Sequence, residues 1–389
     1  METSFWDKKF DRRDFFKGAA GAAAAVTVTS MLPRDVFAAA RDLKTEQVSW
    51  EACQKLTPAE MAKRSGMTKI GYDYLLDKAN HLTDSHIRGI ALDGLKSPQP
   101  KLLELFPDDA SKERVRAKLL DAGYIKSENT IQQIFPPDKG AHACVQEFQI
   151  SPGSGWGSHH AYPAGLVTHV ATDLQIALSV FECYENMYGY DMDRELLTSA
   201  ILLHDNQKPW VLQWREDNAC LPEVNIAGTG AHHILEICDV IHRGLDPKLV
   251  VTIACSHEHP GWESQEKQVV GWIKAAGIIT DTDPVKYGLL ASDGQTLPLP
   301  RRQEGFLVHL GDHDFVLTAP VSKWLSQKLS ELAKSVYHLS DEEIAGKPFY
   351  TLRDYLYSQK SDMHLYQIWV DGGDAALVKA VTDIVAPRS

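Results

Sequence analysis

The sequence lacks several features that would each indicate a protein class. Its 6 cysteines in 389 residues are too few for a small disulfide scaffold, and no two have the Cys-x-x-Cys spacing of a cysteine-based zinc site. No apolar run approaches the ~20 residues of a membrane-spanning helix. Basic residues are also in deficit, with 40 Lys and Arg against 52 Asp and Glu and a net charge of −12. A chain this acidic is poorly suited to neutralising a phosphate backbone, so no polymeric nucleic acid is expected as a partner.

Strand-like patterning is scarce as well. Few segments alternate apolar and polar residues with a period of two, whereas helical spacing recurs along most of the chain, so the fold class is predicted to be mainly α. With 44% hydrophobic residues, the chain can bury a sizeable core. Its length favours two or three domains.

The N-terminus contains a segment with the features of a targeting signal. Residues Asp11-Arg12-Arg13-Asp14-Phe15-Phe16-Lys17 resemble a bacterial twin-arginine export motif, with an acidic residue where Ser or Thr is usual before the Arg pair. A short run rich in Ala and Gly follows, and cleavage is expected after Ala38 or, alternatively, Ala40. Residues 1–38 are therefore predicted to be a signal peptide. The resemblance implies the twin-arginine export machinery as a partner, a folded protein in the periplasm or outside the cell, and no membrane attachment after cleavage.

Histidines gather in the middle of the chain. Eleven of the 16 lie between His159 and His313. The most informative of them is His204, which directly precedes Asp205 at the end of an apolar helical run. An imidazole nitrogen and a carboxylate oxygen are both good ligands for divalent cations. Burying such groups without a partner is costly, and a metal ion provides one partner for several of them.

The order of these residues resembles the HD superfamily of metal-dependent phosphohydrolases, in which a lone His, an adjacent His-Asp pair and a distant Asp lie on helices. Here they are His169, His204 with Asp205, and Asp312. The stretch from His160 to His169 and the segment Leu202-Leu203-His204-Asp205-x-x-Lys208 also resemble that family. The resemblance implies an HD-domain helical bundle over residues 141–325, between an N-terminal helical region (39–140) and a C-terminal helical extension (326–389).

The resemblance further implies one or two divalent metals per chain, with Mn, Fe, Mg, Co and Ni all open. His169, His204, Asp205 and Asp312 would bind the first, and Asp205 would bridge to a second held by His233 and His257. On helical spacing, His233 is preferred to His232 and His257 to His259, because each shares an apolar face. Asp312 is preferred to Asp281 and Asp293 because it is expected inside a long helix that reaches Trp324.

The remaining assignments concern the substrate. Asp205 and Lys208 are the predicted catalytic residues, although Lys208 could simply face a helix dipole. His160 and Tyr162 are predicted to contact the substrate, and Arg301 and Arg302 could form an anion site or be solvated loop charges.

Three functions follow from this reading. The first is hydrolysis of a small-molecule phosphate ester or phosphodiester through metal-activated water. The alternative is an HD-type mixed-valence di-iron oxygenase acting on a polyol or an organophosphonate, and the third is a binding protein with a decayed site. Gln207 replaces the usual Gly of the signature, and the segment from His257 to Trp262 is not the GYP motif of cyclic-dinucleotide phosphodiesterases. No oligonucleotide-binding barrel is evident, which argues against an exoribonuclease.

Overall fold

The computed structural model describes residues 43, 45–139 and 144–388, so the predicted signal peptide and its cleavage site lie outside the described residues. The described chain is mainly α, as predicted. Its one sheet is a short antiparallel ladder of β1 (Asn225–Ile226) and β2 (Thr229–Gly230). Within these ranges, no helix is long and apolar enough to cross a bilayer.

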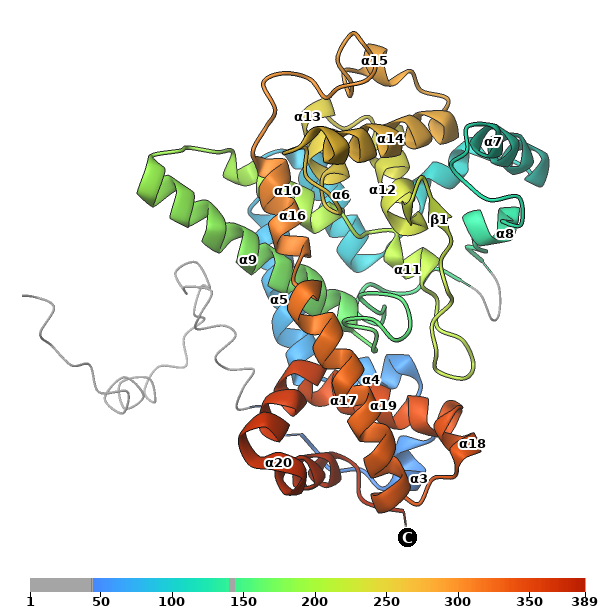
Figure 1. Cartoon of the computed structure of the whole chain (residues 1–389), viewed down its shortest axis with the longest axis vertical. Helices are drawn as coiled ribbons and strands as arrows, with labels where there is room; N and C mark the ends of the chain where they lie inside the picture. The colour runs from blue at the N-terminus through green and yellow to red at the C-terminus, as the bar shows by residue number, and fades with distance from the viewer. Residues whose placement is uncertain (1–42, 44, 140–143, 389) are drawn as a thin grey trace, which may run out of the picture.

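The helices surround two hydrophobic cores, which occupy the upper and lower parts of Figure 1. The main core lies above and includes the buried faces of the two longest helices in this part, α9 and α14. The elements of this part are α5 (Gly66–Asn80), α6 (Ser85–Lys96), the 3₁₀ helix η3 (Lys101–Leu105), α7 (Asp109–Asp121), α8 (Ile131–Ile134), α9 (Gly165–Tyr188), α10 (Arg194–Leu203), α11 (Lys208–Val211), α12 (Ala231–His242), α13 (Pro247–Ala254), α14 (Glu263–Thr280), α15 (Pro284–Tyr287) and α16 (Glu304–Asp312).

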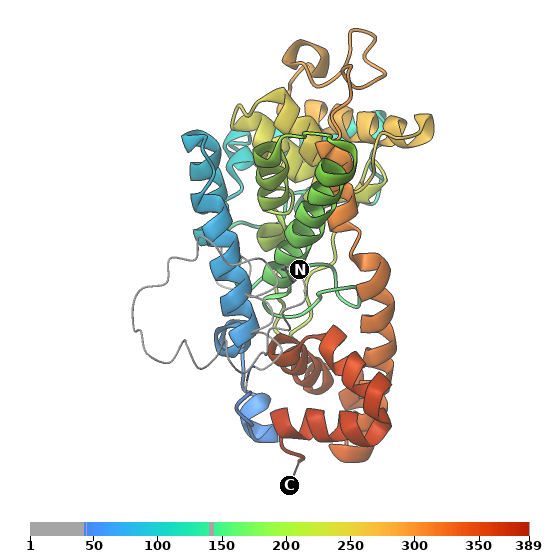
Figure 2. The same ribbon diagram turned by 90° about the vertical axis from the view of Figure 1, so that its left-hand side faces the viewer.

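The second core joins the two ends of the described chain. Its elements are α3 (Trp50–Cys53), α4 (Pro58–Arg64), α17 (Phe315–Val336), α18 (Asp341–Ile344), α19 (Lys347–Lys360) and α20 (Asp362–Ile384). The Val48 N–H donates to the Ile384 carbonyl at 3.0 Å, and the Ala386 N–H donates to the Val48 carbonyl at 2.8 Å. In two perpendicular views, α17 leads from the upper part into the lower one (Figures 1 and 2). The described part of the predicted N-terminal region, residues 45–139, is thus shared between the two cores, because Trp50 packs in the second and Leu75 in the main one.

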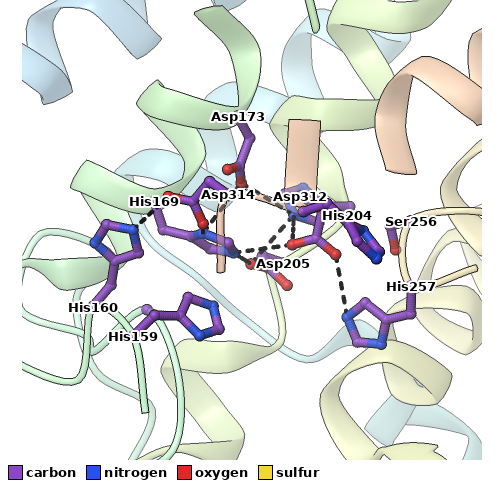
Figure 3. Close-up of polar contacts among 12 residues, drawn as sticks. His159, His160, His169, Asp173, His204, Asp205, Ser256, His257, Asp312 and Asp314 are labelled. Atoms are coloured by element: carbon purple, nitrogen blue, oxygen red, sulfur yellow. Dashed lines mark hydrogen bonds and ion pairs between the residues drawn. The ribbon is translucent and has the colours of Figure 1, made fainter. Parts of the chain in front are cut away.

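The helix boundaries follow local chemistry. Thr57 caps α4 through a capping box with Glu60, and Pro58 occupies the first helical position, where no N–H is needed. The single long helix expected through Asp312 to Trp324 is wrong. α16 ends at Asp312, α17 begins at Phe315, and His313 leaves helical geometry at ψ 15°. The break turns the chain so that both Asp312 and Asp314 face the interior beside α9 (Figure 3).

The start of α9 is held by a tight loop. Within the loop, the Gly153 N–H donates to the His160 carbonyl at 2.9 Å, and the Leu166 N–H on α9 donates to the Ser151 carbonyl at 3.1 Å. His160 and Ala164 adopt left-handed backbone conformations with φ of 49° and 69°. The loop therefore lies directly against the first turn of the helix that carries His169.

Candidate metal centre

Four of the predicted ligands come from three different helix ends and meet at one point. His169 lies on the second turn of α9, His204 is the C-terminal capping residue of α10, Asp205 follows it, and Asp312 ends α16. One ligand atom from each lies within 4.8 Å of the others, and all four residues are buried. Figure 3 shows the four side chains pointing toward one another.

The distances suit a shared cation better than direct pairing. The His169 Nε2 atom lies 3.0 Å from Asp205 Oδ2 and 3.3 Å from Asp312 Oδ1, and His204 Nε2 lies 3.3 Å from Asp205 Oδ2. None of these contacts has hydrogen-bond geometry, so the Nε2 atoms of His169 and His204 and the Oδ1 atom of Asp205 are buried without a hydrogen-bond partner, while Asp205 Oδ2 pairs with Lys208. Buried orphan lone pairs are costly, and one divalent cation would satisfy them together. The donor set of two imidazoles and two carboxylates fits such an ion.

The Nδ1 atoms of the two imidazoles, which point away from the centre, have partners that orient the rings. His204 Nδ1 lies 2.8 Å from the Ile201 carbonyl, which accepts its proton and leaves the Nε2 lone pair facing the centre. His169 Nδ1 faces the carboxylates of Asp173 and Asp314 at 3.3 and 3.7 Å. Carboxylates behind a histidine fix its tautomer and raise its basicity as a ligand.

Lys208 belongs to the same buried site. Its Nζ atom lies 2.5 Å from Asp205 Oδ2 and donates to the Gly153 carbonyl at 2.6 Å. Burial alone would lower the pKa of Lys208, but Asp205 and Asp312 outweigh it and raise that pKa. Burial would likewise raise the pKa of Asp205, but His204 and Lys208 hold it well below its usual range. The pair is therefore ionised at neutral pH, and Lys208 faces Asp205 rather than a helix C-terminus.

A second group of histidines lies on the other side of Asp205 and Asp312. His257 Nε2 lies 3.6 Å from Asp312 Oδ2, and Thr229 Oγ1 holds its Nδ1 at 2.7 Å. The structure places both His232 and His233 nearby. His232 Nε2 lies 3.6 Å from Asp205 Oδ1 while Glu223 holds its Nδ1 at 2.7 Å. His233 stacks on His257 at 4.2 Å, with its Nε2 buried and unpaired. By contact with a carboxylate of the centre, His232 is thus the better placed of the two.

His160 and Tyr162, which are predicted to contact the substrate, are both buried. His160 Nε2 lies 2.8 Å from Asp314 Oδ2, and its Nδ1 lies 3.2 Å from the Tyr162 hydroxyl. Tyr162 has no exposed surface and packs against Tyr357 in the second core. Both residues therefore stand behind His169, on the side away from Asp205.

The alternatives to Asp312 and the two arginines of the candidate anion site have other partners. Asp281 is 91% exposed and pairs with Lys118, while Asp293 caps a turn through Thr296. Arg301 forms a bidentate pair with Glu266, and Arg302 pairs with Glu304.

Asp173, Asp314 and Glu223 were missed in the sequence. Asp173 is one helical turn after His169 on a fully buried face, and Asp314 is two residues after Asp312. An acid on an apolar helical face is a signal that could have identified Asp173. Glu223, in contrast, sits in a loop and carries no periodic signal.

The buried state of His233 has a consequence for pH. Burial first, then the neighbouring His232, lowers the pKa of His233 to about 3. Between that value and the ordinary 6.5 the unfolded chain binds a proton that the folded chain does not, so stability falls as pH falls below about 6.5. In metal-free protein we expect His233 to contribute up to ~1.4 kcal/mol per pH unit to this slope.

Urea unfolding of chelator-treated protein at several pH values between neutrality and moderate acidity measures the effect. The His233→Gln variant should show a flatter slope than the parent. The exposed His86 offers a control, since His86→Gln should leave the slope unchanged. Equal slopes in the parent and His233→Gln would contradict the assignment.

Comparisons with known proteins give one match to a signal-sequence family and two partial matches to curated proteins. Residues 9–29 match the family described as TAT (twin-arginine translocation) pathway signal sequence, so the chain carries this export signal. The chain is 36% identical over 59 residues to dihydroneopterin 2',3'-cyclic phosphate phosphodiesterase of Methanocaldococcus jannaschii, covering 15% of this chain and 24% of the relative. It is 29% identical over 130 residues to 3'-5' exoribonuclease YhaM of Bacillus pumilus, covering 32% of this chain and 40% of the relative. No solved structure matches the chain significantly. The chain thus spans less than half of each relative, and both relatives are hydrolases.

Proposed function

We propose that this chain, which resembles the HD superfamily of metal-dependent phosphohydrolases and carries a twin-arginine signal, hydrolyses a phosphate ester or phosphodiester of a small molecule after export to the periplasm or cell exterior. The observation that carries the proposal is the convergence of His169, His204, Asp205 and Asp312 at one buried point, where the Nε2 atoms of both histidines and the Oδ1 atom of Asp205 have no hydrogen-bond partner. The cationic Lys208 lies in direct contact with this group.

His169, His204, Asp205 and Asp312 would hold the first cation. His257 and either His232 or His233 would hold a second, with the Asp205 carboxylate between the two sets of histidines. A divalent cation bound there would lower the pKa of a water molecule and withdraw charge from a phosphoryl group.

The protein groups have separate tasks. The ionised Asp205 carboxylate can accept a hydrogen bond from an attacking water and orient it toward phosphorus. Lys208 keeps its charge because two carboxylates surround it, and this charge can stabilise the negative charge that grows on the phosphoryl oxygens. With two contacts to Asp205 and Gly153, the Nζ atom retains one hydrogen for that purpose.

Exposure gives the direction of approach. The side chain of His257 is 22% exposed, whereas those of Asp205 and Asp312 are 1% and 7% exposed. The His159 ring lies 5.3 Å from the His169 ring and 5.8 Å from the ring of the partly exposed Phe315. We infer that a small organic phosphate reaches the four ligands from the side of His257, the most exposed of these side chains, with its phosphoryl end first.

The test is a metal-supplemented assay of the mature protein. After chelation, Mn²⁺, Mg²⁺, Fe²⁺, Co²⁺ or Ni²⁺ is added with p-nitrophenyl phosphate, bis(p-nitrophenyl) phosphate, a nucleoside 2',3'-cyclic phosphate or single-stranded RNA. We expect turnover of a small ester or diester, with the cyclic substrate suggested by the archaeal relative and RNA by the exoribonuclease. The proposal fails if no phosphoester is hydrolysed with any of these metals. Retained iron, with oxygen consumed on a polyol or organophosphonate, would favour the oxygenase instead.

Lys208 gives a sharper prediction for the same assay. Lys208→Met removes the buried charge, and we expect kcat to fall by ~10²–10³-fold because one preorganised donor to the developing charge is lost. Bound metal, measured on the same samples, should remain close to the parent value. Lys267, exposed on α14, supplies the matched control Lys267→Met, which should keep full activity. A kcat within a few-fold of the parent would remove Lys208 from the catalytic group.

A further inference from the structure

A second cluster of potential ligands lies outside the centre described above. One ligand atom each from Glu258, His259 and His309 falls within 4.8 Å of the others. Glu258 and His259 are half-buried in the turn after α13, and His309 is buried on α16, one turn before Asp312. None of the three belongs to the ligand set of the proposed catalytic centre. We define them here as the 258–309 cluster.

The turn after α13 contributes residues both to the catalytic centre and to the 258–309 cluster. His257 turns toward Asp312 in the catalytic centre, at 3.6 Å between Nε2 and Oδ2. The next two side chains instead approach His309, whose ring centroid lies 4.9 Å from that of His259. The residues before and after Glu258 thus belong to different ligand groups.

Hydrogen bonds engage only part of the ligand capacity of the cluster. The Glu258 carboxylate accepts from the His259 N–H at 3.2 Å and from Gln268 Nε2 at 3.4 Å, and each oxygen keeps a further lone pair. His309 Nδ1 donates to the Ser256 carbonyl at 3.0 Å, so its Nε2 lone pair is free. His313 Nδ1 likewise donates to the His309 carbonyl at 2.9 Å, and its ring lies 3.6 Å from the His309 ring. The His259 Nδ1 lone pair accepts the Gly261 N–H at 3.0 Å, a single contact that a cation would replace.

The surroundings of the two histidines leave room for an ion and its water ligands. His259 and His309 line a cavity of about 160 Å³ whose other walls include Tyr184, Phe306 and Leu310. Imidazole nitrogens beside one carboxylate suit a borderline divalent cation such as Zn²⁺, Co²⁺ or Ni²⁺ better than Mg²⁺, which prefers oxygen ligands and retains its waters.

We propose that the 258–309 cluster binds a divalent cation of the Zn²⁺, Co²⁺ or Ni²⁺ type, separate from the catalytic centre. The two places are joined through Ser256. Its carbonyl receives the His309 proton, while its hydroxyl lies 3.2 Å from His233 Nδ1. A cation here would fix the turn that carries His257.

The test counts Co²⁺ bound per chain. The chelator-treated mature protein is equilibrated with excess Co²⁺, and the bound metal is measured by dialysis with its visible absorption spectrum. We expect His259→Gln and Glu258→Gln each to bind one equivalent less than the parent or to bind that equivalent at least tenfold more weakly. The exposed His86 again supplies the control, since His86→Gln should keep the full number of equivalents.

Two further arms keep the outcomes distinct. Asp205→Asn empties the catalytic centre, so the equivalent that survives in this variant should disappear when His259→Gln is added. Circular dichroism establishes that each variant is folded, and Glu258→Gln reports independently if His259→Gln is not. Unchanged capacity and affinity in both the His259 and Glu258 variants would overturn the proposal, whatever the Asp205 variant does.

Discussion

Asp205→Asn should remove most of the bound metal and lower kcat by at least ~10³-fold. Asp205, like Asp312, contacts both groups of histidines: its Oδ2 faces His169 and His204, and its Oδ1 faces His232. An amide has no negative charge and offers a weaker oxygen ligand, so each proposed cation would lose a charged donor. The substitution is nearly isosteric, and the loss of metal should therefore not be a consequence of a cavity.

Metal content per chain and kcat are measured on the same preparations. Asp281→Asn is the matched control, because Asp281 is an exposed aspartate that ends α14 in a left-handed conformation, which Asn also tolerates. We expect it to retain both metal and activity. Full metal content in Asp205→Asn would show that the ligands have been wrongly assigned.

Gly165→Ala should destabilise the protein by ~3 kcal/mol or more. A Cβ atom placed on Gly165 would lie 1.8 Å from the His160 carbonyl oxygen and 3.0 Å from the Gly153 nitrogen. Both are backbone atoms of the loop that lies against α9, so no side-chain rotation relieves the clash. The loop would have to move away, and the Gly153 carbonyl that accepts from Lys208 would move with it.

Urea unfolding of the parent and the variant measures this loss, and kcat should fall in parallel because Lys208 loses its anchor. Gly89 on α6 is the control, since a Cβ there meets nothing within 4 Å. Gly89→Ala should stabilise the helix by ~0.5–1 kcal/mol. Equal stability of Gly165→Ala and the parent would mean that the loop is not held against α9 as described.

The parts of the site that follow helical periodicity could be predicted from the sequence. His204 and Asp205 stand where an apolar run stops, and His169 lies one helical turn after the buried Leu166, so their positions on the elements follow from local pattern. The chain order of the ligands also drew attention to Asp312. The structure brings it to the other three although the helix that holds it is shorter than expected.

The contacts that support the ligands could not be predicted. His160 meets Asp314 across 154 positions of sequence, and neither residue stands in a periodic pattern. The choice between His232 and His233 was made from helical faces alone, yet Glu223, a loop residue, turns the His232 ring toward Asp205. Periodicity predicts which face of a helix is buried, but not which residues from distant parts of the sequence contact that face.

The same limit applies to the arrangement of the helices. The amphipathic pattern of α4 predicts that it packs against something, and the capping box at Thr57 predicts where it begins. Nothing in the pattern indicates that its partner is α19, almost 300 residues later, because apolar faces of similar width are interchangeable at the level of sequence.

The backbone bridge between Val48 and the segment 384–386 has a consequence for biosynthesis. The second core needs residues from both ends of the described chain, so it cannot form while the C-terminal segment is still inside the ribosome. Its assembly is therefore post-translational. A chain that stops before α19 leaves the apolar faces of α3 and α4 without their partner, and one that stops short of Ile384 loses the bridge to Val48. For a protein carrying a signal for the export of folded chains, this contact makes the folded state conditional on finished synthesis.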